Sequence, residues 1–233
     1  MTKREHLEEA LGVAFKKPAL LKEALTHRSY LNENPSWGSS QNERLEFLGD
    51  AVLELAITEF LFGRFPDDDE GRLTGIRAAL VNYQMLASIA ETIRLGDFLY
   101  LSKGEMKDNG RAREVILANA LEAVIGAVYL DRGYGTAQRV VHALVAIRLE
   151  EVMTKKLYKD PKSSLQEILQ ERKKMTPTYR VLSESGPDHA KEFVVGVFVG
   201  KEKLSEGKGA SKQEAEACAA ERGLEEFNES RTF

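Results

Sequence analysis

Four acidic residues near position 50 have the spacing that places carboxylates along one side of a helix. At about 100° per residue, all four fall within an arc of roughly 80°: Glu43, Glu46, Asp50 and Glu54. Apolar residues back and border this stripe: Leu45, Phe47, Leu48, Val52, Leu53, Leu55 and Ile57. Like charges at helical spacing repel one another, and partial burial raises that cost unless a cation or a shared proton relieves it. The stripe indicates a metal site, and a solvated helix face that happens to carry acids is the alternative.

A second helical segment carries two polar groups in apolar surroundings. Between positions 115 and 128 the only polar side chains are Asn119 and Glu122, which lie on neighbouring turns of one face. A lone carboxylate in such a helix is costly unless it is paired, hydrogen-bonded or bound to a metal. Glu122 therefore either contributes to a metal site or forms an ion pair with an arginine such as Arg44 or Arg77.

Together the two segments offer a convergent, oxygen-rich site made of Glu43, Glu46, Asp50, Asn119 and Glu122. Hard oxygen ligands suit Mg²⁺ or Mn²⁺ better than zinc. The four histidines are scattered and there is one cysteine, so a structural zinc site is not expected. No glycine-rich P-loop motif is present to hold a nucleotide cofactor. The residues therefore predict carboxylate-held Mg²⁺ acting on a phosphate.

The composition is that of a globular protein from a reducing compartment. Its 233 residues are 42% hydrophobic and 30% charged, enough for two domains that each bury a core. The amino-terminal segment lacks the apolar stretch of a signal peptide, and the apolar run 115–130 is too short and too polar for a membrane span. Cys218 alone cannot form an intrachain disulfide, so we expect a cytoplasmic protein without membrane contact. The net charge of −4 and the pI near 5.7 disfavour a generic nucleic-acid binder but not a localised basic patch.

Four motifs stand in order along the chain: LTHRSY at 25–30, NERLEFLGDAVL at 42–53, FPDDDEGRLTGIRAALVN at 65–82 and ILANALEAVIGAVYLD at 116–131. Together they resemble the bacterial ribonuclease III family, which implies an all-helical nuclease domain that acts on double-stranded RNA as a homodimer. The residues implied as metal ligands or their supports are Glu43, Glu46, Asp50 and Glu122. Asp50 and Glu122 would be the indispensable catalytic pair, and Glu70 would line the cleft. Asn119 departs from the family pattern, because many members carry Asp there; its carbonyl oxygen can still coordinate a metal, but without the charge.

The resemblance also implies a reaction. Mg²⁺ held by the acids would lower the pKa of a bound water and neutralise the phosphodiester, so that in-line attack leaves 5′-phosphate and 3′-hydroxyl ends. Two sites in a homodimer would cut each strand of a duplex once and leave short 3′ overhangs. Phe47 and Leu48 beside the acids offer apolar surface for that dimer, although core packing would also account for either residue. Ribosomal RNA precursors and structured messages are the substrates that the family suggests.

The last third of the chain changes character. Residues 154–162 are polar and basic, and they predict a linker between a nuclease domain at 1–153 and a second domain at 163–229. In the second domain a helix, for which Ser164 is a plausible N-cap, is followed by three strands and an alanine-rich helix. This α-β-β-β-α order resembles a double-stranded-RNA-binding domain. The predicted fold class is therefore multidomain, an all-α domain followed by an α+β domain.

RNA contacts in such a domain come from a small set of polar groups. A glycine loop before a helix lets backbone N–H groups face phosphate, lysines add charge, and other polar side chains reach 2′-hydroxyls. The residues expected at this interface are Ser163, Gln166, Glu167, His189, Lys208, Ser211 and Lys212. Residues 159–228 carry twelve basic and thirteen acidic side chains, so binding by this domain alone is expected to be modest.

Two other functions stay open at this level. A noncatalytic duplex-RNA-binding regulator would keep the fold and lose cleavage, and Asn119 is the feature that favours it. A metal-stabilised helical scaffold without RNA chemistry would make the carboxy-terminal pattern a coincidence. Cutting of an RNA duplex only in the presence of Mg²⁺ separates the nuclease from both.

Overall fold

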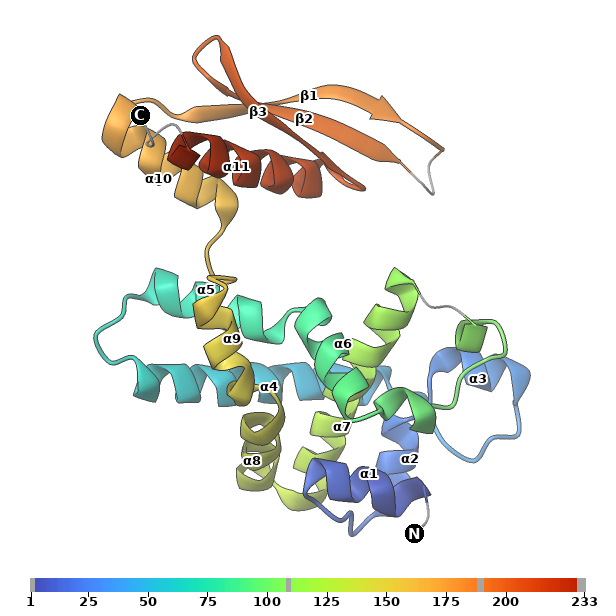
Figure 1. Cartoon of the computed structure of the whole chain (residues 1–233). Helices are drawn as coiled ribbons and strands as arrows, with labels where there is room; N and C mark the ends of the chain where they lie inside the picture. The colour runs from blue at the N-terminus through green and yellow to red at the C-terminus, as the bar shows by residue number, and fades with distance from the viewer. Residues whose placement is uncertain (1–2, 108–109, 188–190, 230–233) are drawn as a thin grey trace. The chain divides into compact units, whose positions relative to one another are not determined.

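The computed structural model describes residues 3–107, 110–187 and 191–229, and the chain divides into two units, residues 1–158 and 159–233. The first unit is built from helices (Figure 1). Its α-helices are α1 (Lys3–Leu11), α2 (Pro18–Ala24), α3 (Arg28–Glu33), α4 (Glu43–Arg64), α5 (Glu70–Val81), α6 (Tyr83–Thr92), α7 (Arg111–Arg132), α8 (Tyr134–Leu144) and α9 (Leu149–Thr154). Short 3-10 helices lie between some of them: η1 (Leu95–Phe98), η2 (Glu105–Lys107) and η3 (Ala146–Arg148).

The long helices α4 and α7 cross at the centre of this unit (Figure 1). From Ile116 to Val128 nearly every side chain of α7 is apolar and buried, so this helix needs neighbours on all sides. Leu53, Ile57 and Leu61 of α4 are buried in the same core. The predicted core helix is confirmed. Within the described ranges, no helix is long and apolar enough to cross a membrane.

Side-chain caps fix where α3, α5 and α6 begin. Asp69 accepts a hydrogen bond from the Arg72 N–H at 2.8 Å, and Asn82 accepts one from the Met85 N–H at 2.9 Å. His27 caps α3, because its Nδ1 accepts a hydrogen bond from the Ser29 N–H at 3.3 Å. The caps therefore define the start of α5, which carries Glu70, and place His27 at the edge of α3.

A buried carboxylate fastens the segment between α1 and α2 to the end of α7. The Asp131 side chain is fully buried and accepts hydrogen bonds from the backbone N–H groups of Lys16 and Lys17 at 2.7 and 2.9 Å. Arg132 adds an ion pair of 3.4 Å between its Nε and an Asp131 oxygen, and it also donates to the Ala14 carbonyl. The amino-terminal segment is thereby held against α7.

Asp131→Ala is expected to lower the free energy of unfolding by about 2–4 kcal/mol, because two backbone N–H groups lose their buried acceptor. Urea denaturation with an unchanged m-value would measure this loss. Asp67→Ala, in the exposed stretch before α5, is the matched control and should change the free energy by less than about 0.5 kcal/mol. Equal stability of the two variants would mean that the Asp131 contacts contribute little.

The second unit consists of α10 (Pro161–Lys173), β1 (Pro177–Ser185), β2 (Glu192–Val199), β3 (Glu202–Gly209) and α11 (Lys212–Glu229). The strands form an antiparallel sheet in the order β1-β2-β3, and both helices lie on one face of it (Figure 1). Its core contains Leu165 and Leu169 of α10 with Val197, Ala219 and Ala220. The predicted α-β-β-β-α order is confirmed.

The helix α10 begins earlier than the sequence indicates. Asp160 is its N-cap and accepts the Ser163 N–H at 2.9 Å, and Pro161 follows as the first helical residue. The prediction of Ser164 as N-cap is wrong, because a proline at the first position and a carboxylate cap before it favour the earlier start. The last two positions of the expected linker 154–162 therefore belong to a helix, and α9 ends at Thr154, the first position of that linker.

Candidate functional site

Two glycines let the backbones of α4 and α7 touch where the predicted acids lie. A Cβ on Gly49 would stand 2.6 Å from the carbonyl carbon of Glu122 and 2.9 Å from the nitrogen of Gly126. A Cβ on Gly126 would meet the Leu45 carbonyl in the same way. Interiors are packed too closely to absorb such an atom without moving a helix. Asp50 and Glu122, next to this contact, therefore project from backbones that touch.

Of the predicted acids, Glu122 has the surroundings that differ most from water. It is half-buried, and burial is the first cause that raises the pKa of Glu122 to about 8. The carboxylates of Asp50, Glu46 and Glu54 add to this shift, in that order. No described residue forms an ion pair with Glu122; Arg77, a partner considered from the sequence, pairs with Glu54 at 2.9 Å. The ionised form of Glu122 is therefore disfavoured, because no described protein group balances its charge.

Glu46 is held by Asn119 across the crossing. Burial first, and then the charge of Glu43, raise the pKa of Glu46, whereas a hydrogen bond with the Asn119 side chain opposes the shift. Glu43 is exposed, with one carboxylate oxygen 3.5 Å from Nη1 of Arg28 and the other accepting from the Gln41 amide at 3.0 Å. Asn119 therefore acts as a donor to a carboxylate, a role that an ionised aspartate could not take.

The donor set suits a hard divalent cation, since it combines carboxylate oxygens with one amide oxygen. The unbalanced charge around Glu122 is what a cation would offset. In the parts of the chain that the structure describes, however, no three His, Cys, Asp or Glu side chains stand close enough to hold an ion. The acids share the region of the crossing, where like charges repel one another. Their convergence on one ion stays a prediction.

A pocket of about 420 Å³ opens beside these acids. Its polar lining comes from His27, Arg28, Asn42, Glu43, Glu46, Glu105 and Asn119. Nδ1 of His27 lies 2.8 Å from the Ser29 hydroxyl oxygen, which in turn accepts the Ser102 N–H at 3.1 Å. Burial lowers the pKa of His27, and the charge of Glu105 opposes that shift. The pocket thus joins the segment 25–30 and η2 to Glu43 and Glu46 of α4 and to Asn119 of α7.

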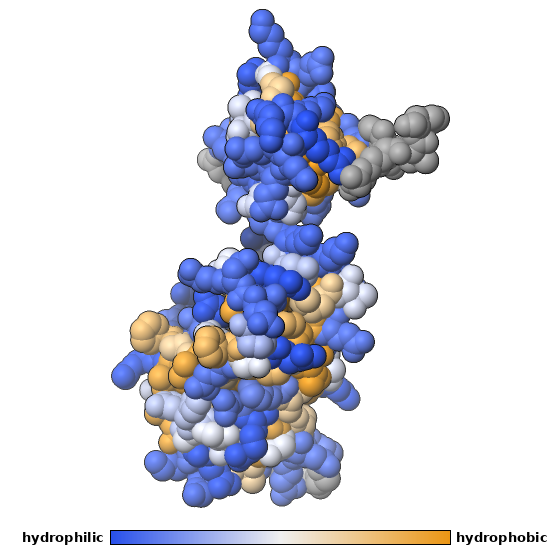
Figure 2. Space-filling model, turned by 90° about the vertical axis from the view of Figure 1, so that its left-hand side faces the viewer, coloured by the Kyte–Doolittle hydropathy of each residue, from blue (hydrophilic) through white to orange (hydrophobic). Residues whose placement is uncertain are grey.

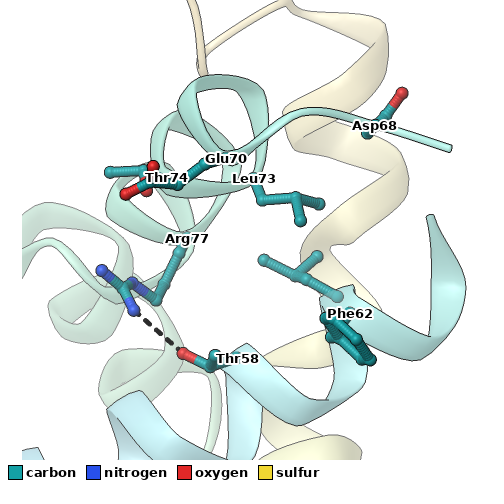
Figure 3. A pocket seen from close by; sticks show the side chains of 8 residues that line it. Thr58, Phe62, Asp68, Glu70, Leu73, Thr74 and Arg77 are labelled. Carbon is teal, nitrogen blue, oxygen red and sulfur yellow. Dashed lines mark hydrogen bonds between the residues drawn. The ribbon is translucent and has the colours of Figure 1, made fainter. Parts of the chain in front are cut away.

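Glu70 does not join the other acids within one chain. It begins α5 and lines a separate pocket of about 430 Å³ between α4 and α5 (Figure 3). The other residues that line this α4–α5 pocket are Thr58, Leu61, Phe62, Asp68, Leu73, Thr74 and Arg77. Arg77 donates a hydrogen bond of 3.0 Å to the Thr58 hydroxyl (Figure 3). The cleft that Glu70 lines is therefore distinct from the pocket that contains Glu46 and Asn119.

Exposed apolar side chains run along α4, and we call Phe47, Leu55 and Phe62 the α4 stripe. Their side chains are 81%, 49% and 76% exposed, and spacings of about two turns place them on one helix face. Figure 2 shows hydrophobic side chains reaching the surface of the helical unit among hydrophilic ones. Leu55 is exposed because the core covers the face of Leu53 and Ile57 instead.

The residues expected to contact RNA lie at the ends of elements in the second unit. Ser163, Gln166 and Glu167 are exposed on α10, Lys208 is on β3, and Ser211 and Lys212 stand at the start of α11. Lys208 pairs with Glu192 at 3.4 Å, and the Ser211 hydroxyl accepts the Glu214 N–H at 3.2 Å, which caps α11. Lys212 is exposed. His189 lies outside the described residues.

Sequence reasoning missed three features of this site. The contact between Gly49 and Gly126 had one local signal, because a glycine inside a helix costs about 1 kcal/mol relative to alanine and needs a packing reason. The place of His27 had a weaker signal, its position in the LTHRSY motif. Glu105 had none, because its approach to His27 depends on the path of the chain between α6 and α7.

Two families match the chain. The Ribonuclease-III-like family matches residues 17–149, and the Double-stranded RNA binding motif matches residues 161–226. A Ribonuclease 3 of Campylobacter fetus is 47% identical over 98% of this chain and 100% of its own length. A Ribonuclease 3 of Carboxydothermus hydrogenoformans is also 47% identical, over 94% of this chain and 93% of its own length.

Solved structures of ribonuclease III nuclease domains are similar to the helical unit. The nuclease domain of ribonuclease III from Campylobacter jejuni has a TM-score of 0.57 and 44% identity, over 64% of this chain and 97% of that chain. A second structure of that domain, described as flexible in a region involved in dimer formation, has a TM-score of 0.54 and 46% identity. It covers 63% of this chain and 95% of its own.

Proposed function

The chain belongs to the ribonuclease III family and is an endonuclease for double-stranded RNA, and on this premise we propose that cleavage depends on Mg²⁺ held where α4 and α7 cross. Mn²⁺ is the proposed substitute. The proposed products carry 5′-phosphate and 3′-hydroxyl ends with short 3′ overhangs. Ribosomal RNA precursors and structured messages are the proposed substrates.

The crowding of carboxylates around the partly buried Glu122 is the observation that carries this proposal. A carboxylate that serves only structure is buried with a partner, because an unpaired buried charge is costly. Glu122 has three acids near it and no described ion-pair partner, which fits a residue whose partner is a bound cation. Asp50, exposed beside it, is the second proposed ligand and catalytic residue. Glu43, Glu46 and Asn119 are the proposed supporting oxygen donors.

The chain's own contribution is a fixed frame for these oxygens. Asn119 orients Glu46 by a hydrogen bond, and Arg28 and Gln41 restrain Glu43. The backbone contact at Gly49 fixes the separation of the two helices, so the acids cannot relax apart by helix movement. Bound Mg²⁺ would supply a water of lowered pKa and a positive charge toward the phosphodiester.

Incubation of a uniform RNA duplex with the protein, in Mg²⁺ and in EDTA, tests the proposal. We expect fragments in Mg²⁺, intact bound duplex in EDTA, and restored cutting when Mn²⁺ replaces Mg²⁺. A single strand of the same sequence is the control and should be cut far more slowly, because the second unit recognises duplex shape. A duplex that is bound but intact in Mg²⁺ would make the protein the noncatalytic regulator instead.

The active form is proposed to be a homodimer joined through the α4 stripe. A contiguous exposed apolar surface of this kind is typical of a protein interface. Leu55 lies about midway between Phe47 and Phe62, so antiparallel pairing of two α4 helices would place Leu55 near the twofold axis. Phe47 would then meet the α4–α5 pocket beside the partner's Phe62. A dimer-forming region is also described for the Campylobacter jejuni domain, which supports a homodimer.

Such a dimer would also give Glu70 a role. Glu70 lines the α4–α5 pocket, which would receive the partner's Phe47. Because Glu46 directly precedes Phe47, Glu70 would come close to the acids of the other copy. In this arrangement Glu70 approaches the acids of the other copy, so it lies apart from the acids of its own chain.

Phe47→Asp is expected to weaken dimerisation by about 30-fold or more, because a charge replaces a large apolar side chain that would be buried in the α4–α5 pocket of the other copy. Sedimentation equilibrium over a range of concentrations measures the change. Ile147→Asp is the matched control, since Ile147 is 67% exposed but lies on η3 rather than on α4. The proposal is overturned if Phe47→Asp and Ile147→Asp dimerise equally well.

Lys212→Ala is expected to weaken duplex binding about threefold, and equally for duplexes of different sequence, because Lys212 stands at the start of α11 and would contact phosphate. The slope of log affinity against log salt should fall by about one. Lys201→Ala, exposed between β2 and β3, is the control and should leave both quantities unchanged. An unchanged salt slope for Lys212→Ala would remove it from the interface.

A further inference from the structure

The LTHRSY segment lies beside the acids, yet the function proposed above gives it no role. His27 lines the 420 Å³ pocket next to the α4–α7 crossing, with carboxylates on more than one side. These carboxylates belong to Glu43, Glu46 and Glu105. Glu43 and Glu46 come from α4, and Glu105 comes from η2. Together with the segment that carries His27, three separate parts of the chain line this pocket.

The proton of the His27 ring is placed by its neighbours. The Ser29 backbone N–H points to Nδ1 at 3.3 Å, and a backbone N–H can only donate. The Ser29 hydroxyl lies 2.8 Å from the same nitrogen while it accepts the Ser102 N–H, so its own proton is free to face Nδ1. Nδ1 is therefore an acceptor, and the neutral ring carries its proton on Nε2. No described residue accepts a hydrogen bond from that N–H.

The chemistry of the pocket selects one class of ligand. The carboxylates accept hydrogen bonds and repel phosphate, and Arg28, which also lines the pocket, is paired with Glu43 at 3.5 Å. The Nε2–H of His27 donates. A hydroxyl group can accept from the imidazole and donate to a carboxylate at the same time. In RNA the groups with this property are the ribose 2′-hydroxyls, which also distinguish RNA from DNA.

We propose that this pocket receives the ribose of a nucleotide that flanks the scissile bond, with its 2′-hydroxyl accepting a hydrogen bond from His27 Nε2 and donating one to a carboxylate. The proposal rests on the nuclease function proposed above. It makes His27 a substrate-contacting residue and gives the nuclease unit its own means of recognising RNA, in addition to that of the second unit.

Two substitutions separate this contact from the helix cap. His27→Asn keeps an acceptor near the position of Nδ1, so it preserves the cap of α3, but it removes the Nε2–H. His27→Gln keeps an amide donor near the position of Nε2 and weakens the cap.

We expect His27→Asn to retain the melting temperature and to cut about three- to tenfold more slowly, the effect of one hydrogen bond. His27→Gln should melt at a lower temperature and cut faster than His27→Asn. His6→Asn, exposed on α1, should cut at the unchanged rate.

Duplexes with a single 2′-deoxy nucleotide on either side of the cut complete the test. One of these two substitutions should slow the unchanged protein about three- to tenfold and should slow His27→Asn no further. Long-range ¹⁵N spectra of the free protein should show His27 protonated at Nε2. The inference is overturned if His27→Asn cuts at the unchanged rate, or if both 2′-deoxy duplexes are cut as fast as the all-ribose duplex. Equal slowing of both proteins by the deoxy substitution would overturn it as well. If the unchanged protein cuts no duplex in Mg²⁺, the proposed function itself fails, which is a different result.

Discussion

Replacing Glu122 by Gln is expected to slow duplex cleavage by about 100- to 1,000-fold while duplex binding changes by less than about twofold. The amide keeps the shape of the side chain and one oxygen, but it removes the negative charge that would hold the cation. Glu122 is the acid on which burial and neighbouring charges act most strongly, with a pKa of about 8. Binding should persist because the second unit and its lysines are untouched. Single-turnover rates and filter binding on the same duplex measure the two effects.

Glu114→Gln is the matched control for this prediction. Glu114 lies in the first turn of the same helix and is exposed, so its loss should change the cleavage rate by less than about twofold. In EDTA, Glu122→Gln should melt at the same temperature as the unchanged protein or higher, because it removes a carboxyl group whose ionised form is disfavoured by burial and by neighbouring carboxylates. Cleavage by Glu122→Gln at the unchanged rate would show that the acids of this crossing are not the catalytic centre.

Gly49→Ala is expected to lower the free energy of unfolding by about 3 kcal/mol, because the new methyl group would meet the backbone of α7. Its nearest neighbours would be the carbonyl group of Glu122 and the nitrogen of Gly126, and backbone atoms cannot move aside as a flexible side chain can. The helices must separate, so cleavage should fall even at temperatures where the variant is folded. Thermal melting and the cleavage rate at a low temperature measure the two effects.

Gly63→Ala provides the control on the same helix. A Cβ at Gly63 would have nothing within 4 Å, and the residue is exposed. Alanine should therefore stabilise α4 by about 0.5–1 kcal/mol through its higher helix propensity. If both alanine variants are neutral, the close contact between α4 and α7 is not needed for stability.

The sequence predicts most of the fold because its local patterns are strong. The apolar run of α7 can only be a core helix, and the acids of α4 repeat at helical spacing with apolar residues around them. The three strands of the second unit likewise follow from short apolar segments separated by turns. These features depend on residues that are close in sequence.

Features that depend on long-range contacts could not be predicted in the same way. The sequence could name Asn119 as an oxygen donor but not as the hydrogen-bond partner of Glu46, which lies on another helix. It could name Glu70 as a cleft-lining residue but not the pocket to which α5 carries it. Periodicity gives the faces of α4 but not which neighbours cover them, so it could not show that Leu55 is exposed.

The ends left on a defined RNA duplex, after a reaction started by adding Mg²⁺, test the central claim most directly. The account predicts that both strands are cut, that every product has a 5′ phosphate and a 3′ hydroxyl, and that no product forms in EDTA. This outcome follows from attack by a water whose pKa is lowered at a carboxylate-held cation. Products with 2′,3′-cyclic phosphates, or cutting that continues in EDTA, would contradict the account, because the attacking group would then be the RNA's own 2′-hydroxyl.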